Sequence, residues 1–235
     1  WISPPAYTRK APVYLQADGG DAITGIPEGS VLTVRLSGEG ADQPITFTPD
    51  GNTEGQTPAE AEQGALANSA SFALSSGGRL EAAGRSWEIA VVPDEAPVIA
   101  FKGTPRAAAN GALELEYTVT DDYGVTRAHA EIAPAGDVDP HAEPVYPLPE
   151  FSLNMPARSS KDHSAFTSRN LTEHPLSGTP VTITLIAEDA AGHVGKSPAL
   201  EMVLPERTFH NLLAGSVAEQ RQIFALDTRR MPEAL

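Results

Sequence analysis

Apolar and polar residues alternate along most of the chain, which is the pattern of β-strands with one buried face. Between Ser30 and Ser37 the apolar positions Leu32, Val34 and Leu36 fall on a single face of the expected strand. A similar alternation returns in stretches that begin at Ser71, Trp87, Leu113, Val181 and Leu200. The chain is therefore predicted to be mainly β and to consist of many short strands.

Two of the later strands have the clearest one-sided pattern. Their inward positions are Leu113, Leu115, Tyr117 and Val119 in one strand and Val181, Ile183, Leu185 and Ala187 in the other. Most residues between these positions are polar. Each strand is therefore expected to cover a core on one side and to meet water on the other.

A short segment rich in proline and acid, from Pro93 to Pro97, separates two sets of strands. Proline cannot donate to a β-ladder, and such segments are typical of links between domains. A chain of 235 residues is long enough for two sandwiches of about 100 residues each. We therefore expect two tandem immunoglobulin-like β-sandwich domains, residues 1–94 and 95–205.

Two regions depart from the alternation. Between Thr57 and Asn68 the sequence fits either one short helical turn or a surface loop. Residues 134–164 contain too many prolines for a central strand and are expected to form a long excursion at a sheet edge. Tyr146 and Phe151 lie in this excursion, where they either contact a ligand or, as is favoured, pack within the loop.

After the second set of strands the apolar spacing changes to that of an amphipathic α-helix. A C-terminal helix is predicted within residues 206–235, leading into the remainder of a longer protein. Its apolar face is expected to contain Phe209, Leu213, Val217 and Phe224. This face either binds an unknown protein partner, as the start of a longer coiled region, or packs on the second sandwich.

The charge balance limits the classes of partner. The chain has 31 acidic and 16 basic residues, which gives a formal net charge of -15. Such a charge repels polyanions, so nucleic acid and anionic lipid surfaces are disfavoured as partners. The sequence has no cysteine, which is compatible with either side of a membrane.

The sequence lacks the motifs of catalysis and cofactor binding. It contains no Gly-x-Ser-x-Gly turn, no pair of histidines at i, i+4 spacing and no glycine-rich phosphate loop. We therefore expect neither an enzyme nor a resident organic cofactor.

Acidic turns suggest one metal site, for calcium. Two of these turns follow the one-sided strands, which correspond to strands B and F of an immunoglobulin-like domain and end where the chain enters from the linker. The candidate ligands are Asp94, Glu95, Asp121, Asp122, Glu188 and Asp189. Carboxylates at such a joint would supply the oxygen ligands that calcium prefers. Ordinary turn formation by Asp and Gly explains the same segments and is the favoured interpretation.

Three stretches of the chain resemble those of a known family. They are Trp1–Thr8 with Ala11–Leu15, Val92–Pro97, and Leu204–Phe209 with its continuation to Asp227. Together they resemble bacterial membrane-anchored proteins, of the alphaproteobacterial type, that have unknown function, N-terminal transmembrane helices and periplasmic Ig-like β domains. The resemblance implies the periplasmic side of the inner membrane, with anchoring through segments outside this chain, and no established catalytic residue.

The sequence thus favours a non-catalytic structural or protein-interaction module of a cell-envelope protein. The alternative is a ligand-recognition module for envelope polymer or carbohydrate, with calcium between the domains making the pair more rigid.

Overall fold

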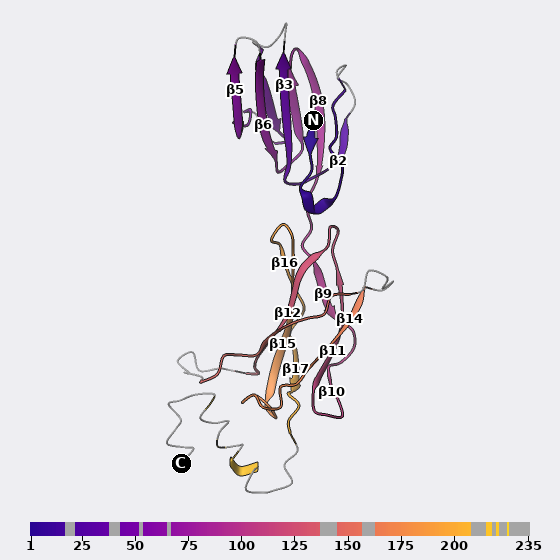
Figure 1. The fold of residues 1–235 in the computed structure, drawn as a ribbon, viewed down its shortest axis with the longest axis vertical. Coiled ribbons are helices and arrows are strands. Elements are labelled where there is room, and N and C mark those ends of the chain that lie inside the picture. The colour runs from indigo at the N-terminus through magenta and orange to yellow at the C-terminus, as the bar shows by residue number, and fades with distance from the viewer. Residues whose placement is uncertain are drawn as a thin grey trace. The chain divides into compact units, whose positions relative to one another are not determined.

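A computed structural model describes residues 1–16, 22–37, 43–51, 54–64, 67–136, 145–156, 163–207, 215–217, 220 and 225 (Figure 1). The chain divides into two compact units, Trp1–Glu95 and Ala96–Leu235, which we describe one at a time. Both units are built from β-strands. Within the described ranges, no helix has the length and apolar character needed to cross a membrane.

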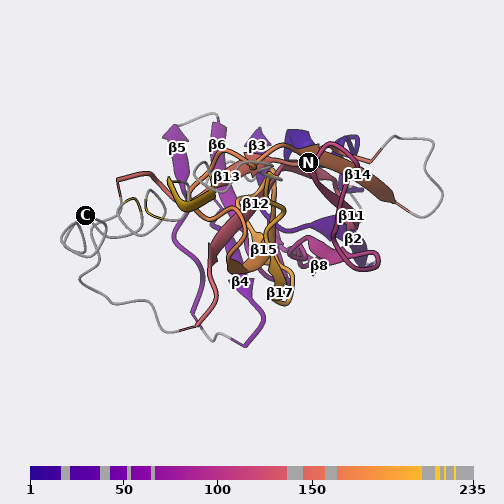
Figure 2. The same ribbon diagram turned by 90° about the horizontal axis from the view of Figure 1, so that it is seen from below.

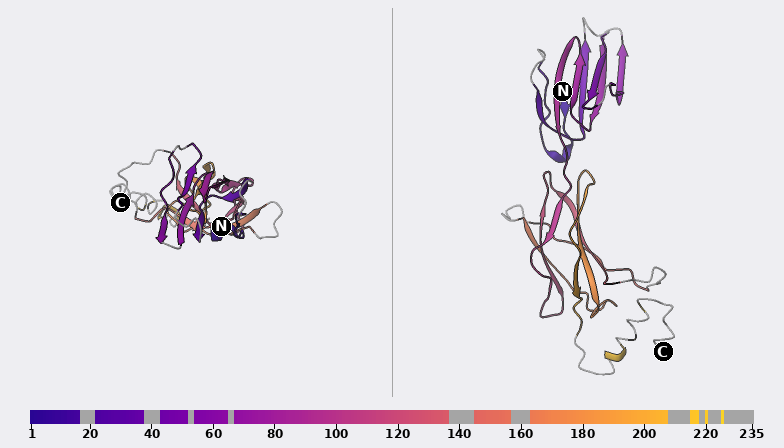
Figure 3. Two further views of the ribbon diagram at one scale, coloured as in Figure 1. Left: turned by 90° about the horizontal axis from the view of Figure 1, so that it is seen from above. Right: turned by 180° about the vertical axis from the view of Figure 1, so that it is seen from behind.

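The first unit consists of short strands and one 3₁₀ turn. They are β1 (Ile2–Ser3), η1 (Ala6–Thr8), β2 (Ile23–Pro27), β3 (Ser30–Ser37), β4 (Ile45–Pro49), β5 (Glu60–Gly64), β6 (Ala67–Leu74), β7 (Gly78–Ala82) and β8 (Arg85–Val92). The strands form two sheets, ordered β1-β3-β6-β5 and β2-β8-β7-β4, and Figure 3 shows them from behind. β2 runs parallel to β8. In immunoglobulin nomenclature the sheets are A-B-E-D and A′-G-F-C, so the first unit has an immunoglobulin-like topology.

The alternation in β3 determines which side chains enter the first core. Leu32 is fully buried, whereas its neighbour Val31 remains 41% exposed, as the sequence pattern predicts. Phe47 from one sheet and Phe72 from the other lie in the same core, with their ring centroids 5.9 Å apart. These contacts between facing side chains hold the two sheets together.

The second unit is a second sandwich. Its strands are β9 (Val98–Phe101), β10 (Arg106–Ala107), β11 (Leu113–Thr120), β12 (Val125–Pro134), β13 (Glu150–Ser152), β14 (Ser164–Arg169), β15 (Pro180–Asp189), β16 (Val194–Lys196) and β17 (Leu200–Val203). One sheet has the order β10-β11-β14, with β9 also paired to β11; the other has the order β13-β12-β15-β16, with β17 also paired to β15. Figure 2 shows β12 and β15 side by side, the longest ladder of this unit. This is again an immunoglobulin-like arrangement, with β11 as strand B and β15 as strand F.

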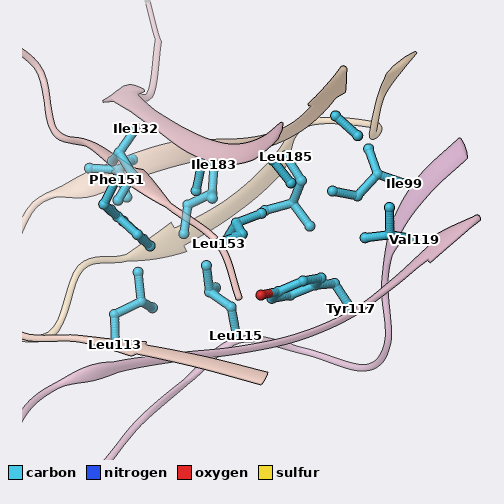
Figure 4. Close-up of a cluster of buried hydrophobic side chains, with 14 of the residues drawn as sticks. Ile99, Leu113, Leu115, Tyr117, Val119, Ile132, Phe151, Leu153, Ile183 and Leu185 are labelled. Atoms are coloured by element: carbon cyan, nitrogen blue, oxygen red, sulfur yellow. The ribbon is translucent and has the colours of Figure 1, made fainter. Parts of the chain in front are cut away.

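Tyr117 occupies the centre of the second core, among the apolar side chains of both sheets (Figure 4). It is fully buried, yet its hydroxyl is satisfied: it donates to the carbonyl oxygen of Asn154 at 2.8 Å and lies 2.6 Å from Oγ1 of Thr167. The backbone N–H of Asn154 donates to the same Oγ1 at 2.9 Å. These three residues close a ring of hydrogen bonds between β11, β14 and the segment after β13, which meets the need of a buried hydroxyl for partners.

Two expectations from the sequence are wrong. The stretch from Thr57 to Asn68 contains neither a helical turn nor only a loop, because β5 lies within it and pairs along β6. A lone edge strand with few apolar residues has a weak alternation, so pairing with a neighbour determines its structure. Ile186 lies between two of the predicted inward positions of its strand, where the alternation predicts exposure to water, but it is only 5% exposed, so the outer face of β15 is covered at this position.

The predicted C-terminal helix is not confirmed. Residues 215–217, 220 and 225 are helical, and the rest of residues 208–235 lies outside the described part of the chain. Ala225 is buried, and its carbonyl oxygen accepts a hydrogen bond of 2.9 Å from the backbone N–H of Val145.

Candidate functional site

The acidic turns of the second unit lie at one end of its sandwich. Thr120, the last residue of β11, pairs with Val98 at the start of β9. In the other sheet, Gly195 approaches the carbonyl oxygen of Pro97 so closely that an added Cβ would lie 1.7 Å from it. Gly195 pairs with Ala187 of β15, so the ends of β11 and β15 and the entry of the chain share one end of this unit.

Asp189 is the structural centre of that end. Burial alone would raise the pKa of its carboxyl, but hydrogen bonds from the backbone N–H groups of His193 and Gly192 and from the His193 ring outweigh it and lower the pKa. The backbone bonds measure 2.8 Å and 2.7 Å, and the contact with Nδ1 of His193 is 3.0 Å. Both carboxylate oxygens are thus engaged in shaping the turn between β15 and β16.

The pKa of the Asp121 carboxyl is shifted in the opposite direction from that of Asp189. Burial raises the pKa of its carboxyl, and the nearby charges of Asp122 and Asp189 raise it further, against hydrogen bonds from the N–H groups of Gly124 and Tyr123. Oδ2 accepts those two bonds, at 2.5 Å and 3.0 Å. Oδ1 is buried without a hydrogen-bond partner among the described residues. This carboxylate shapes a turn and retains one unused oxygen.

The two linker acids belong to the first unit. Asp94 accepts a hydrogen bond of 2.8 Å from the Tyr7 hydroxyl, and its own N–H donates to the Glu28 carboxylate at 3.2 Å. Asp94 is therefore fixed against η1 and the turn before β3, while Glu95 is exposed. Asp94 and Glu95 lie in the first unit, and the other four candidate ligands lie in the second. The six-carboxylate calcium site therefore stays a prediction.

The predicted partner face of the C-terminal segment is described at one position. Val217 is helical and 68% exposed. Phe209, Leu213 and Phe224 lie outside the described residues. Val217 is thus exposed, whereas Ala225 of the same segment is buried and bonded to Val145, so partner binding and packing on the sandwich both stay predictions.

The proline-rich excursion separates its two aromatic residues. Phe151 belongs to β13, pairs with Ala130 and is only 7% exposed in the second core, which agrees with the favoured packing interpretation and not with a ligand contact. Tyr146 is 50% exposed and lies edge-on to His174, with the ring centroids 6.5 Å apart. Nε2 of His174 also lies 3.1 Å from the carbonyl oxygen of Pro147.

The residues around Tyr146 form an exposed apolar surface that the alternation did not indicate. Val145 is 47% exposed and Leu148 is 49% exposed, close to the value for Tyr146. The contacts with His174 and with Ala225 hold this loop in place from two sides. We call residues 145–148 the apolar loop.

A second feature missed from the sequence is a cleft of about 360 Å³ in the first unit. Trp1, Tyr14 and Trp87 line it, together with Arg35 and Arg85. These residues lie far apart in sequence, and only the pairing of β1 with β3 and of β7 with β8 brings them together. A volume of this size falls within the range of small-ligand sites.

The fold and these surfaces define a tandem pair of immunoglobulin-like β-sandwich units. One family model matches the whole chain, residues 1–235. The chain therefore belongs to the family described as "Domain of unknown function (DUF4175)". The expectation of a family of unknown function is thus confirmed. No curated protein matches the chain.

Several solved structures are similar to the chain over most of its length. The FN1-FN3 domains of chicken CNTN1 are 12% identical, with 78% of this chain and 69% of that chain covered and a TM-score of 0.32. A chimeric titin Z1Z2 is 15% identical, covering 80% of this chain and 94% of that chain, with a TM-score of 0.30. The D00-D0 domain of intimin is 14% identical, covering 78% and 96%, with a TM-score of 0.24.

Proposed function

We propose that the chain is a non-catalytic protein-interaction module on the periplasmic side of the inner membrane, in a protein that is anchored through segments outside this chain. The observation that carries the proposal is the apolar loop. Three large apolar side chains, Val145, Tyr146 and Leu148, are each about half exposed on a loop that hydrogen bonds hold in place. A fixed, exposed apolar surface is typical of a protein-binding site.

The ionisable groups support a structural role instead of a chemical one. Of the described carboxylates, those with shifted pKa values are Asp121 and Asp189, and both accept hydrogen bonds from the backbone of their own turns. Catalysis needs a group whose reactive atoms face a substrate. Both carboxylate oxygens of Asp189 and one carboxylate oxygen of Asp121 take part in hydrogen bonds within their own turns.

The C-terminal segment adjoins the apolar loop through the hydrogen bond between Val145 and Ala225. The exposed Val217 lies in the same segment. We therefore include the C-terminal segment in the interaction surface, and the partner would contact both. This extends the predicted partner face, Phe209, Leu213, Val217 and Phe224, by the residues of the apolar loop.

Affinity capture from a solubilised envelope fraction tests this proposal. The bait is the chain itself, compared with a version that ends at Arg207 and with a Leu148→Asp variant. A Val203→Asp variant is the matched control, because Val203 is a 60% exposed valine on β17. One discrete protein should be retained by the chain and by the control but lost from the other two baits. Equal retention by all four baits would contradict the proposal.

A further inference from the structure

The aromatic cleft of the first unit contains both tryptophans of the chain. Trp1 is 40% exposed and Tyr14 is 76% exposed, although aromatic side chains of this size normally contribute to a core. Trp1 and Tyr14 are not among the residues of the first core, which includes Phe47 and Phe72, whereas Trp87 is partly buried and packs against that core. The exposed aromatic faces are thus not needed to close the sandwich and are available to a ligand.

The walls of the cleft are fixed by the fold. Trp1 and Thr33 exchange backbone hydrogen bonds of 2.8 Å in both directions, which continues the pairing of β1 with β3. Val13 is bridged to Ile2 by bonds of 2.7 Å and 2.9 Å, which places the following Tyr14.

The opposite wall is held in the same manner. Nε1 of Trp87 donates to the carbonyl oxygen of Gln16 at 3.0 Å, which ties β8 to the segment after Val13. In the ladder, Trp87 pairs with Leu80, a residue of the buried core. The cleft is therefore largely formed before any ligand arrives, which reduces the entropy lost on binding.

Among the described residues, the charged side chains that line the cleft are arginines. Arg35 and Arg85 lie among the lining residues, and none of the described lining residues is Asp or Glu. This is unusual in a chain with a formal net charge of -15. Guanidinium groups bind carboxylates through paired hydrogen bonds, so Arg35 offers a binding position for a single carboxylate.

The size and charge of the cleft select among ligands. A stable protein complex buries about 800 Å² on each partner, whereas this cleft has a volume of about 360 Å³, which is in the range of small-ligand sites. A nucleic acid would place many phosphates along an acidic protein, which disfavours it. A sugar ring presents an apolar C–H face to an aromatic side chain, and a single carboxylate on that sugar would meet Arg35.

We propose that this cleft binds a short saccharide that carries one carboxylate, with the sugar rings against Trp1, Tyr14 and Trp87 and the carboxylate near Arg35. The saccharide site is separate from the apolar loop of the second unit. The saccharide proposal can therefore be tested, and contradicted, independently of the proposed protein partner.

Cellobiouronic acid and cellobiose are a matched pair of probes, because they differ by one carboxylate. Both are titrated into the whole chain, with tryptophan fluorescence and the two indole N–H signals in the NMR spectrum as readouts. Since both tryptophans line the cleft, the acid should change the fluorescence and shift both indole signals. Cellobiose should bind at least about tenfold more weakly, the difference expected for one charge-assisted hydrogen bond.

Variants locate the site. Tyr14→Ala and Arg35→Gln change exposed side chains, and each should weaken binding of the acid by about tenfold. Tyr146→Ala, which removes an exposed tyrosine from the second unit, should leave it unchanged. The saccharide proposal would be overturned by the absence of indole shifts at millimolar acid, by equal binding of the two sugars, or by equal binding to wild type and Tyr14→Ala. Tighter binding of a proline-rich peptide or a mononucleotide, with the same dependence on Tyr14, would also overturn it.

Discussion

The hydrogen-bonded ring around Tyr117 gives the most quantitative prediction about stability. Tyr117→Phe keeps the aromatic ring in the second core and removes only the hydroxyl. The carbonyl oxygen of Asn154 then loses its donor at 2.8 Å, and the Thr167 hydroxyl loses its acceptor at 2.6 Å. Thr167 is only 6% exposed, so water replaces these bonds poorly.

The magnitude follows from the two lost bonds. A net contribution of about 1 kcal/mol per hydrogen bond gives a destabilisation of about 2 kcal/mol for the second unit. For a domain of this size, that corresponds to a fall in melting temperature of about 8 °C. It also corresponds to an increase of about 30-fold in hydrogen exchange through global opening.

The assay must distinguish the two units. Tryptophan fluorescence reports only the first unit, because both tryptophans lie there. Hydrogen–deuterium exchange of peptides from β11 and β14 reports the second. Tyr117→Phe should accelerate exchange in β11 and β14 and leave the fluorescence transition unchanged. Tyr146→Phe, in the exposed loop, is the control and should change neither.

A destabilisation by Tyr117→Phe of less than about 0.5 kcal/mol would refute this reasoning, because it would mean that the hydrogen-bonded ring adds little to the stability that packing gives the core. A shift of the fluorescence transition of the same size would refute the assumption that the units unfold independently.

Four further predictions concern Gly195 and the acidic turns of the second unit. Gly195→Ala should destabilise that unit by about 3 kcal/mol in urea unfolding, because its Cβ would lie 1.7 Å from the Pro97 carbonyl oxygen; a loss no larger than that of Lys196→Ala would contradict the close approach. The pKa of the Asp189 carboxyl is lowered in the folded state, so the ionised carboxylate stabilises the fold above the unfolded pKa. This stabilisation is lost as the pH falls through the lower, folded pKa. Asp189→Asn should therefore lower the free energy of unfolding by about 2 kcal/mol at pH 7 and leave it unchanged at a pH below the folded pKa. The raised pKa of Asp121 acts in the opposite direction, so Asp121→Asn should raise the melting temperature at pH 7 but not below the unfolded pKa, and an unchanged melting temperature at pH 7 would count against the buried charge. If the predicted calcium site exists, millimolar calcium should raise the melting temperature of the wild type and not of Asp121→Asn; a wild-type melting temperature unaffected by millimolar calcium would exclude it.

The fold could be predicted from local pattern where one face of a strand is buried and the other is wet. β11 follows the alternation along its whole length, as in buried Leu115 and exposed Glu116, and β3 follows it at its start, in buried Leu32 and exposed Val31. β5 could not be predicted in this way, because an edge strand depends on its neighbour β6 instead of its own pattern.

The surfaces were less accessible to sequence reasoning than the strands. The acidic turns could be located because Asp and Gly have strong local preferences at the ends of strands. The apolar loop and the aromatic cleft depend on contacts between distant residues, such as Val145 with Ala225 and Trp87 with Gln16. The nearest sequence signal was the placement of Trp1 and Tyr14 outside the alternating core positions.

Site-specific photo-crosslinking tests the central claim most directly. A benzophenone amino acid replaces Tyr146 in the protein expressed in its native cells, and replaces Phe166, a 45% exposed aromatic residue on β14, in the control. An interaction module that uses the apolar loop should give one discrete crosslinked protein from position 146 and none from position 166. No adduct at position 146, or the same adducts from both positions, would contradict the account.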